Sequence, residues 1–200
     1  NVLWGSRPNQ RAVNGSDGIY IRAHTNERGY FIKGVYINNC KFENLSRNGV
    51  SVIQGEDIVM RDCSGSVRRS LFDIEPNHDY ELTRNVTVEN MVADNSVPSR
   101  GIINDDGTID KVNGIGDGIQ ILADQLDSSN SLIENITFKN ITVIGNGIEG
   151  IDGSSGLTIS RAKNVLLEDI VIENAKYKNT EAVFLIKSIS SNRNENILAK

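Results

Sequence analysis

The 200-residue chain is poor in cysteine, proline, histidine and aromatic residues: it has two cysteines, three prolines, two histidines and 6% aromatics. Two cysteines exclude a disulfide-dense scaffold. No apolar run is long enough to cross a bilayer, and residues 1–5 lack the basic start and apolar core of a signal peptide. A net charge of −5 argues against a nucleic-acid partner and a polybasic membrane surface.

The chain also lacks a sustained helical period and an initiating Met. Its length fits one domain over residues 1–200, and we expect a fragment of a longer chain or a processed one. Eighteen glycines with abundant Asn and Ser predict many tight turns.

One short template recurs: apolar, any, apolar, any, Asn or Asp, apolar. It occupies residues 34–44, 57–63, 85–95, 135–143 and 164–174. The apolar residue after Asn or Asp recurs at steps of 23, 28, 50 and 29 residues, at Cys40, Cys63, Met91, Ile141 and Ile170. Repeats of this length, with variable insertions, are typical of stacked solenoids.

A second segment reads Gly, apolar, any, apolar and alternates as a half-buried strand does. It occurs at residues 17–22, 48–53, 70–75, 117–122, 156–161 and 181–186, with Leu71 and Ala182 in place of Gly in two copies. Nine positions separate Gly49 from Ile58, and nine separate Gly156 from Val165. The sequence therefore predicts an all-β solenoid of about six coils, because one unit alone cannot bury both strands.

Stacking predicts columns of equivalent residues. One inward column is Val35, Ile58, Val86, Ile136 and Val165, and the next is Ile37, Met60, Val88, Phe138 and Leu167. The corner column is Asn39, Asp62, Asn90, Asn140 and Asp169, which predicts a ladder of hydrogen-bonded amides at a sharp turn. Cys40 and Cys63 are expected as stacked, buried thiols about 4.8 Å apart at Cα; a bridge between them is the alternative.

With these residues in view, the chain resembles a right-handed parallel β-helix of the pectate-lyase-like superfamily over residues 15–190. The stretch Phe72-Asp73-Ile74-Glu75-Pro76-Asn77 resembles one in phage tailspikes and secreted glycan-active β-helices. The resemblance implies an extracellular, secreted or virion-surface protein, and a homotrimer.

The insertions border one strand of each coil. Long links at residues 23–33, 76–84 and 123–134 follow this strand, and those at 96–116 and 145–155 precede it. They predict two walls around a groove for an extended polymer, with the Gly-initiated strands as its floor. Residues 96–116 are read as an insertion; the alternative makes 101–104 a floor strand and places Asp105 beside Glu75.

Asp73 and Glu75 form the only acidic pair on the predicted floor. Two residues apart on a strand, they share a face at about 6.5–7 Å between Cα atoms. That suits the acid and base of an inverting glycosidase, and the like charges would raise one pKa. The alternative is a solvated acidic pair. Asp105 and Asp106, in the largest wall loop, are further catalytic candidates.

The remaining candidates are polar or aromatic residues of the floor and its walls, expected to contact substrate. They are Tyr20, Arg22, His24, Ser51, His78, Gln120, Asp152 and Thr158. No metal or other cofactor is expected; calcium at residues 104–110 is the weaker alternative to a simple Asp-Gly turn. Hydrolysis is favoured over elimination because no acidic ligand cluster faces a basic residue.

Three hypotheses follow. The first is an enzyme that binds and cleaves an extracellular polysaccharide through Asp73 and Glu75. The second is a binding module that holds a glycan or cell-wall polymer without cutting it. The third is a structural fibre segment.

Overall fold

The computed structural model describes residues 2–5, 17–23, 27, 29–45, 47–67, 69–94, 102–103, 109–110, 118–122, 133–145, 156–173, 184–187 and 195–200. Within these ranges every regular element is a β-strand. The same ranges therefore contain no helix that could span a membrane.

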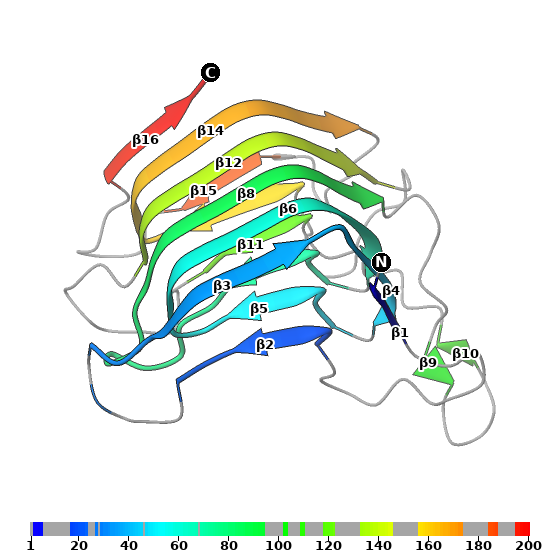
Figure 1. The fold of residues 1–200 in the computed structure, drawn as a ribbon. Coiled ribbons are helices and arrows are strands. Elements are labelled where there is room, and N and C mark those ends of the chain that lie inside the picture. The colour runs from blue at the N-terminus through cyan, green and yellow to red at the C-terminus, as the bar shows by residue number, and fades with distance from the viewer. Residues whose placement is uncertain are drawn as a thin grey trace.

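An eight-stranded sheet contains the template strands. Its members are β1 (Val2–Gly5), β3 (Ile32–Asn38), β4 (Cys40–Leu45), β6 (Gly55–Val67), β8 (Thr83–Asp94), β12 (Ile133–Ile144), β14 (Ala162–Glu173) and β16 (Glu195–Ala199). They run parallel in the order β1-β4-β6-β8-β12-β14-β16, with β3 also paired to β6. Figure 1 shows these strands bending as they stack.

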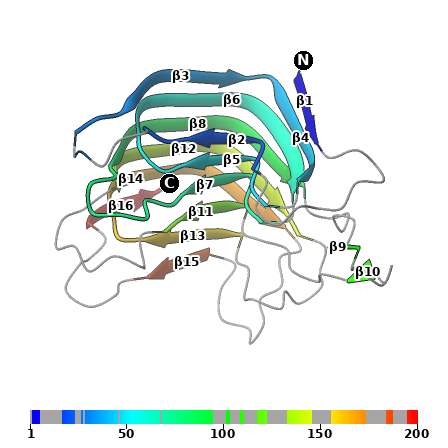
Figure 2. The same cartoon turned by 90° about the horizontal axis from the view of Figure 1, so that it is seen from below.

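A six-stranded parallel sheet contains the Gly-initiated strands. Its members are β2 (Ile19–Ile21), β5 (Val50–Val52), β7 (Phe72–Ile74), β11 (Ile119–Ile121), β13 (Leu157–Ser160) and β15 (Phe184–Lys187). Figure 2 shows them as a ladder of short strands beside the long ones. The chain passes from one sheet to the other and back, an arrangement compatible with a parallel β-helix or β-solenoid.

The strands β9 (Ile102–Ile103) and β10 (Ile109–Asp110) form a small antiparallel pair. Neither belongs to the six-stranded sheet. The prediction that residues 96–116 are an insertion is therefore confirmed for these strands, and the alternative floor strand at 101–104 is wrong.

The predicted inward columns are confirmed by the strand register. Val35, Ile58, Val86, Ile136 and Val165 lie at successive rungs, as do Ile37, Met60, Val88, Phe138 and Leu167. Most of these side chains are fully buried and form one core with the inward residues of the six-stranded sheet. Apolar residues at alternate positions on two facing sheets thus produce a continuous core along the stack.

The polar corners are left-handed turns. Asn39, Asp62, Asn90, Asn140 and Asp169 have φ between 52° and 55°. Asn and Asp adopt this region more readily than other residues with a Cβ, which explains their repetition. The predicted amide ladder is confirmed: Asn140 Nδ2 donates to Asn90 Oδ1, and Asn90 Nδ2 to Asp62 Oδ1, both at 2.8 Å.

A second ladder, which was not predicted from the sequence, lies five residues earlier. Asp57, Asn85, Asn135, Asn164 and Asn196 have φ between 53° and 57°. Side-chain amides join all five rungs at 2.9–3.1 Å. Gly34, at φ 67°, occupies the equivalent position in β3. Each long strand therefore bends twice.

We expect Asn90→Ala to lower the free energy of unfolding by about 1–2 kcal/mol, because alanine is strained at positive φ and breaks the ladder on both sides. Asn90→Gly keeps the turn and removes only the ladder, so it should cost less. Urea denaturation of both variants measures the difference. A glycine variant as unstable as the alanine variant would contradict the role of backbone strain.

Two features of the stack differ from the sequence prediction. Strands β1 and β16 extend it beyond residues 15–190. The predicted alignment of β15 is wrong by one residue, since Leu157 pairs with Phe184 rather than Val183. Residues 183–186 are all apolar, so no alternation specifies which register is correct.

Both cysteines are free thiols. Cys63 is buried as expected, whereas Cys40 is half-buried and donates its backbone N–H to Cys63 Sγ at 3.5 Å. Burial raises the pKa of Cys63 to about 11. The thiolate is the reactive form, so this cysteine is an inert core residue.

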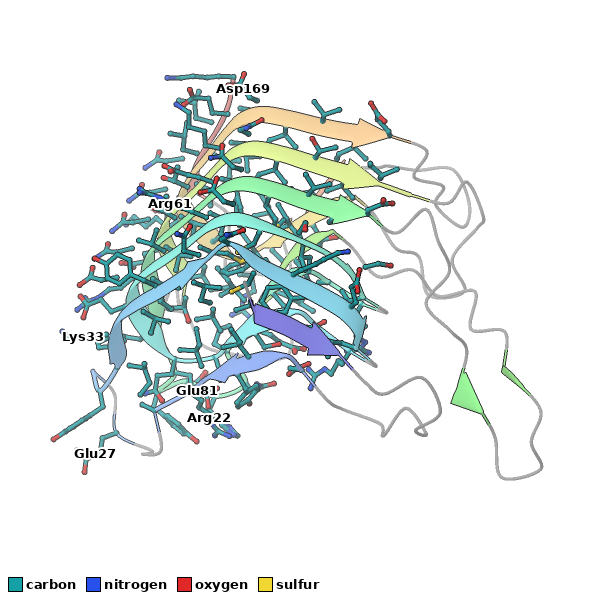
Figure 3. All side chains as sticks on the ribbon, turned by 45° about the vertical axis from the view of Figure 1, so that its right-hand side comes forward. Arg22, Glu27, Lys33, Arg61, Glu81 and Asp169 are labelled. Atoms are coloured by element: carbon teal, nitrogen blue, oxygen red, sulfur yellow. The ribbon has the colours of Figure 1, made fainter. Side chains whose placement is uncertain are left out.

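Charged side chains of alternating sign follow each other along the eight-stranded sheet. One column is Lys33, Glu56, Arg84, Glu134, Lys163 and Glu195. Another contains Arg61, Glu89, Lys139 and Glu168. Ion pairs join neighbouring rungs, such as Arg61 to Glu89 at 3.0 Å and Lys139 to Glu168 at 2.9 Å. Figure 3 shows Lys33 and Arg61 on the outer surface. Exposed pairs stabilise little individually, but alternation avoids like charges one rung apart.

Candidate functional site

The residues on the outward positions of the six-stranded sheet lie in the predicted register. Tyr20, Ser51, Asp73, Gln120 and Thr158 occupy successive rungs of β2, β5, β7, β11 and β13. Their exposure differs from the prediction of an open floor. Tyr20 is 50% exposed, but Ser51, Asp73 and Thr158 are buried. The interpretation of Asp73 as part of a solvated pair is therefore wrong.

The two carboxyl oxygens of Asp73 have different surroundings. Its Oδ2 accepts a hydrogen bond from Asn48 Nδ2 at 2.8 Å and lies 3.5 Å from Ser51 Oγ. Its Oδ1 is buried and has no hydrogen-bond partner among the residues that the structure describes. Burial raises the pKa of Asp73 well above its usual range, and the charge of Glu75 adds to this, while Arg47 opposes it. The site thus favours the neutral acid.

Glu75 lies two residues further along the chain and has a different environment. Its side chain is 14% exposed, and Oε2 lies 2.9 Å from the guanidinium Nη2 of Arg47. The same arginine approaches Asp17 Oδ1 at 3.8 Å. Two carboxyls on one face therefore have unlike partners, an amide for Asp73 and a guanidinium for Glu75.

The raised pKa of Asp73 makes stability depend on pH. An unfolded aspartate has a pKa of about 3.9, so above this pH the folded protein still holds a proton that the unfolded chain has lost. This stabilisation is complete below about pH 4 and is lost as the pH rises through the folded pKa. Relative to Asp73→Asn, we expect the free energy of unfolding of the wild type to fall by up to about 1.4 kcal/mol per pH unit in that window.

Urea denaturation of the two proteins at a series of pH values measures this difference. The asparagine side chain still accepts the bond from Asn48 but does not titrate, so it is a matched reference. A stability difference that is constant above pH 4 would contradict the neutral form of Asp73.

A second polar cluster joins the end of β2 to the segment after β7. Arg22 Nη2 lies 2.9 Å from Oε1 of the fully buried Glu81 (Figure 3). Glu81 Oε2 accepts the backbone N–H groups of Asn77 and His78 at 2.6 and 3.0 Å. The exposed His78 ring stacks on Tyr80 at 5.0 Å between centroids. Glu81 therefore fixes this segment beside Arg22.

Of the other predicted site residues, some have few contacts and some lie outside the described residues. Gln120 Oε1 accepts from Ser70 Oγ at 3.3 Å, which links it to the coil of Asp73. His24, Asp105, Asp106 and Asp152 lie outside the described residues. In the part of the chain that is described, no group of three His, Cys, Asp or Glu side chains is placed to hold a metal ion.

Sequence reasoning missed Arg47, Asn48 and Glu81. A signal for Asn48 was available, because Asp, Asn or Ser precedes the Gly position in several copies of the strand, at residues 17, 48, 70 and 117. The backbone N–H of Asn48 donates to Asp17 Oδ1 at 3.0 Å, so this column links coils. Arg47 and Glu81 lie in connections, where repeat alignment carries no information.

The fold and the site define the class of this protein: it is an all-β protein with two parallel sheets and a polar, partly buried face. No protein-family model, curated protein or solved structure matches the chain.

Proposed function

We propose that this chain is a right-handed parallel β-helix of about six coils that binds and hydrolyses an extracellular polysaccharide. Asp73 is the general acid and Glu75 the general base. The observation that carries the proposal is the contrast between these carboxyls: one is buried with a raised pKa, and the other is ion-paired with Arg47. Environments that separate the proton affinities of two carboxyls are the mark of an acid and base pair.

The proposed reaction inverts the anomeric carbon. Asp73 donates its proton to the glycosidic oxygen as the bond to the leaving sugar breaks. Glu75 takes a proton from the water whose oxygen bonds to the anomeric carbon. Asp73 ends ionised and Glu75 neutral, and proton exchange with solvent resets the pair. Positions i and i+2 of one strand are about 6.5–7 Å apart at Cα, which leaves room for that water.

The second candidate is a binding module that does not cleave. The burial of Asp73, at 1% exposure, favours it, because a bound chain would contact the exposed Tyr20 and part-exposed Arg22 before Asp73. Tyrosine rings suit the apolar faces of sugars. The resemblance to pectate-lyase-like β-helices supports a glycan partner and an extracellular or virion-surface location in both cases.

Reducing-end release from a panel of bacterial capsular and wall polysaccharides tests the proposal. The expected result is release from one polymer by the wild type and no release by an Asp73→Asn, Glu75→Gln double variant that still binds it. Retention on a polymer without release by the wild type would overturn hydrolysis in favour of the binding module.

A further inference from the structure

Two consecutive residues of one coil contact the two carboxyls of the next. Arg47 and Asn48 lie just before β5, and Asp73 and Glu75 lie in and just after β7. Arg47 contacts Glu75 and Asn48 contacts Asp73, at 2.9 and 2.8 Å. A single dipeptide therefore supplies the nearest polar partner of both carboxyls.

The side-chain amide of Asn48 has one possible orientation. The backbone N–H of Ser70 can only donate, and it donates to Asn48 Oδ1 at 3.1 Å. Asn48 Nδ2 must therefore face Ser51 Oγ, at 2.9 Å, and Asp73 Oδ2. The amide offers Asp73 a hydrogen-bond donor but no positive charge. Since Oδ2 accepts this bond, the proton of the neutral acid belongs on Oδ1, which has no partner in the described part of the chain.

The charges around the two carboxyls come from three coils. Asp17 contributes a carboxylate just before β2, and Arg47 and Arg69 contribute cations just before β5 and β7. The neighbouring floor positions in β5 and β11 are the neutral Ser51 and Gln120. Of these charges, only Arg47 makes a direct contact with either carboxyl, and it contacts Glu75.

We propose that Arg47 and Asn48 are positioning residues for the two carboxyls: Arg47 holds the Glu75 side chain through an ion pair, and Asn48 places the proton of the neutral Asp73 on Oδ1. The consequence for catalysis rests on the proposed hydrolase function. The assignment of the Asp73 proton does not, because it follows from contacts within the protein.

Carbon-13 NMR of the side-chain carboxyl carbons tests the assignment directly. In the wild type at about pH 6, two units above the usual pKa of an aspartate, Asp73 should show the shift of a protonated acid. An ionised Asp73 at that pH would overturn the proposal, and this measurement needs no variant that could fail to fold.

Variants then assign the effect to each partner. Arg47→Met should increase the proton affinity of Asp73, because the charge of Arg47 lowers it in the wild type, whereas Arg47→Lys, which keeps the charge, should restore most of the wild-type value. Asn48→Ala should further increase the proton affinity of Asp73, because the bond to its ionised form is lost. An unchanged titration of Asp73 in both Arg47→Met and Asn48→Ala would overturn the assignment.

The pH–activity profile separates this inference from the proposed function. If Asp73 is the acid, the alkaline limb should move to higher pH in Arg47→Met and return in Arg47→Lys. A protonated Asp73 in a protein that releases no sugar would support the assignment and refute the hydrolase. Sugar release with unchanged titrations would refute the assignment alone.

Discussion

Glu75→Gln is expected to slow polysaccharide hydrolysis by about 10²–10⁴-fold, because a positioned general base contributes a factor of this size. The amide keeps the shape of the side chain and cannot accept the proton of the attacking water. Substrate binding should change little, so the loss should appear in kcat. The initial rate of reducing-end release measures it.

Asp73→Asn should cause a loss of similar size with a natural polymer, and the substrate can distinguish the two roles. A glycoside with a nitrophenolate leaving group needs little protonation, so it should restore much of the activity of Asp73→Asn but not of Glu75→Gln. Asp79→Asn is the control, since Asp79 is an exposed carboxylate four residues from Glu75. Equal losses in all three variants would contradict the assigned roles.

Phe138→Ala is expected to lower the free energy of unfolding by about 3–5 kcal/mol. The Phe138 ring, on β12, is fully buried and meets the Phe72 ring of β7 edge to face, with centroids 6.1 Å apart. This contact joins the two sheets directly, so truncation leaves a cavity between them that neighbouring coils cannot fill.

Thr137→Ala is the matched control for this core prediction. Thr137 precedes Phe138 on β12, is only half-buried and lies on the opposite face, so its replacement should cost less than about 1 kcal/mol. Urea denaturation of the two variants gives the comparison. Similar losses of unfolding free energy in the two variants would contradict the stabilising role of the core between the two sheets.

The stacked sheets were predictable because equivalent positions in every coil have the same burial and the same backbone conformation. Val35 and its equivalents must be apolar, and Asn39 and its equivalents must tolerate positive φ, so both columns are visible in the sequence. The register of β15 was not predictable, because residues 183–186 are apolar on both faces of the strand. Alternation determines a register only where the two faces differ.

The candidate site was predictable in position but not in environment. The repeat places Asp73 beside Ser51 and Gln120, as alternation predicted. Burial of Asp73 and its bond from Asn48 depend on side chains from a neighbouring coil, which repeat matching treats as equivalent rather than as partners. The non-repeating connections that supply Arg47 and Glu81 carry no such signal.

The alternating charge columns give the stack a longer period than its backbone has. The backbone repeats with every coil, but the charge pattern of Lys33, Glu56, Arg84, Glu134 and the rungs beyond repeats only with every second coil. Excising the coil of Arg84 would place Glu56 next to Glu134, whereas excising two would place Glu56 next to Lys163. The natural unit for lengthening or shortening this protein is therefore a pair of coils.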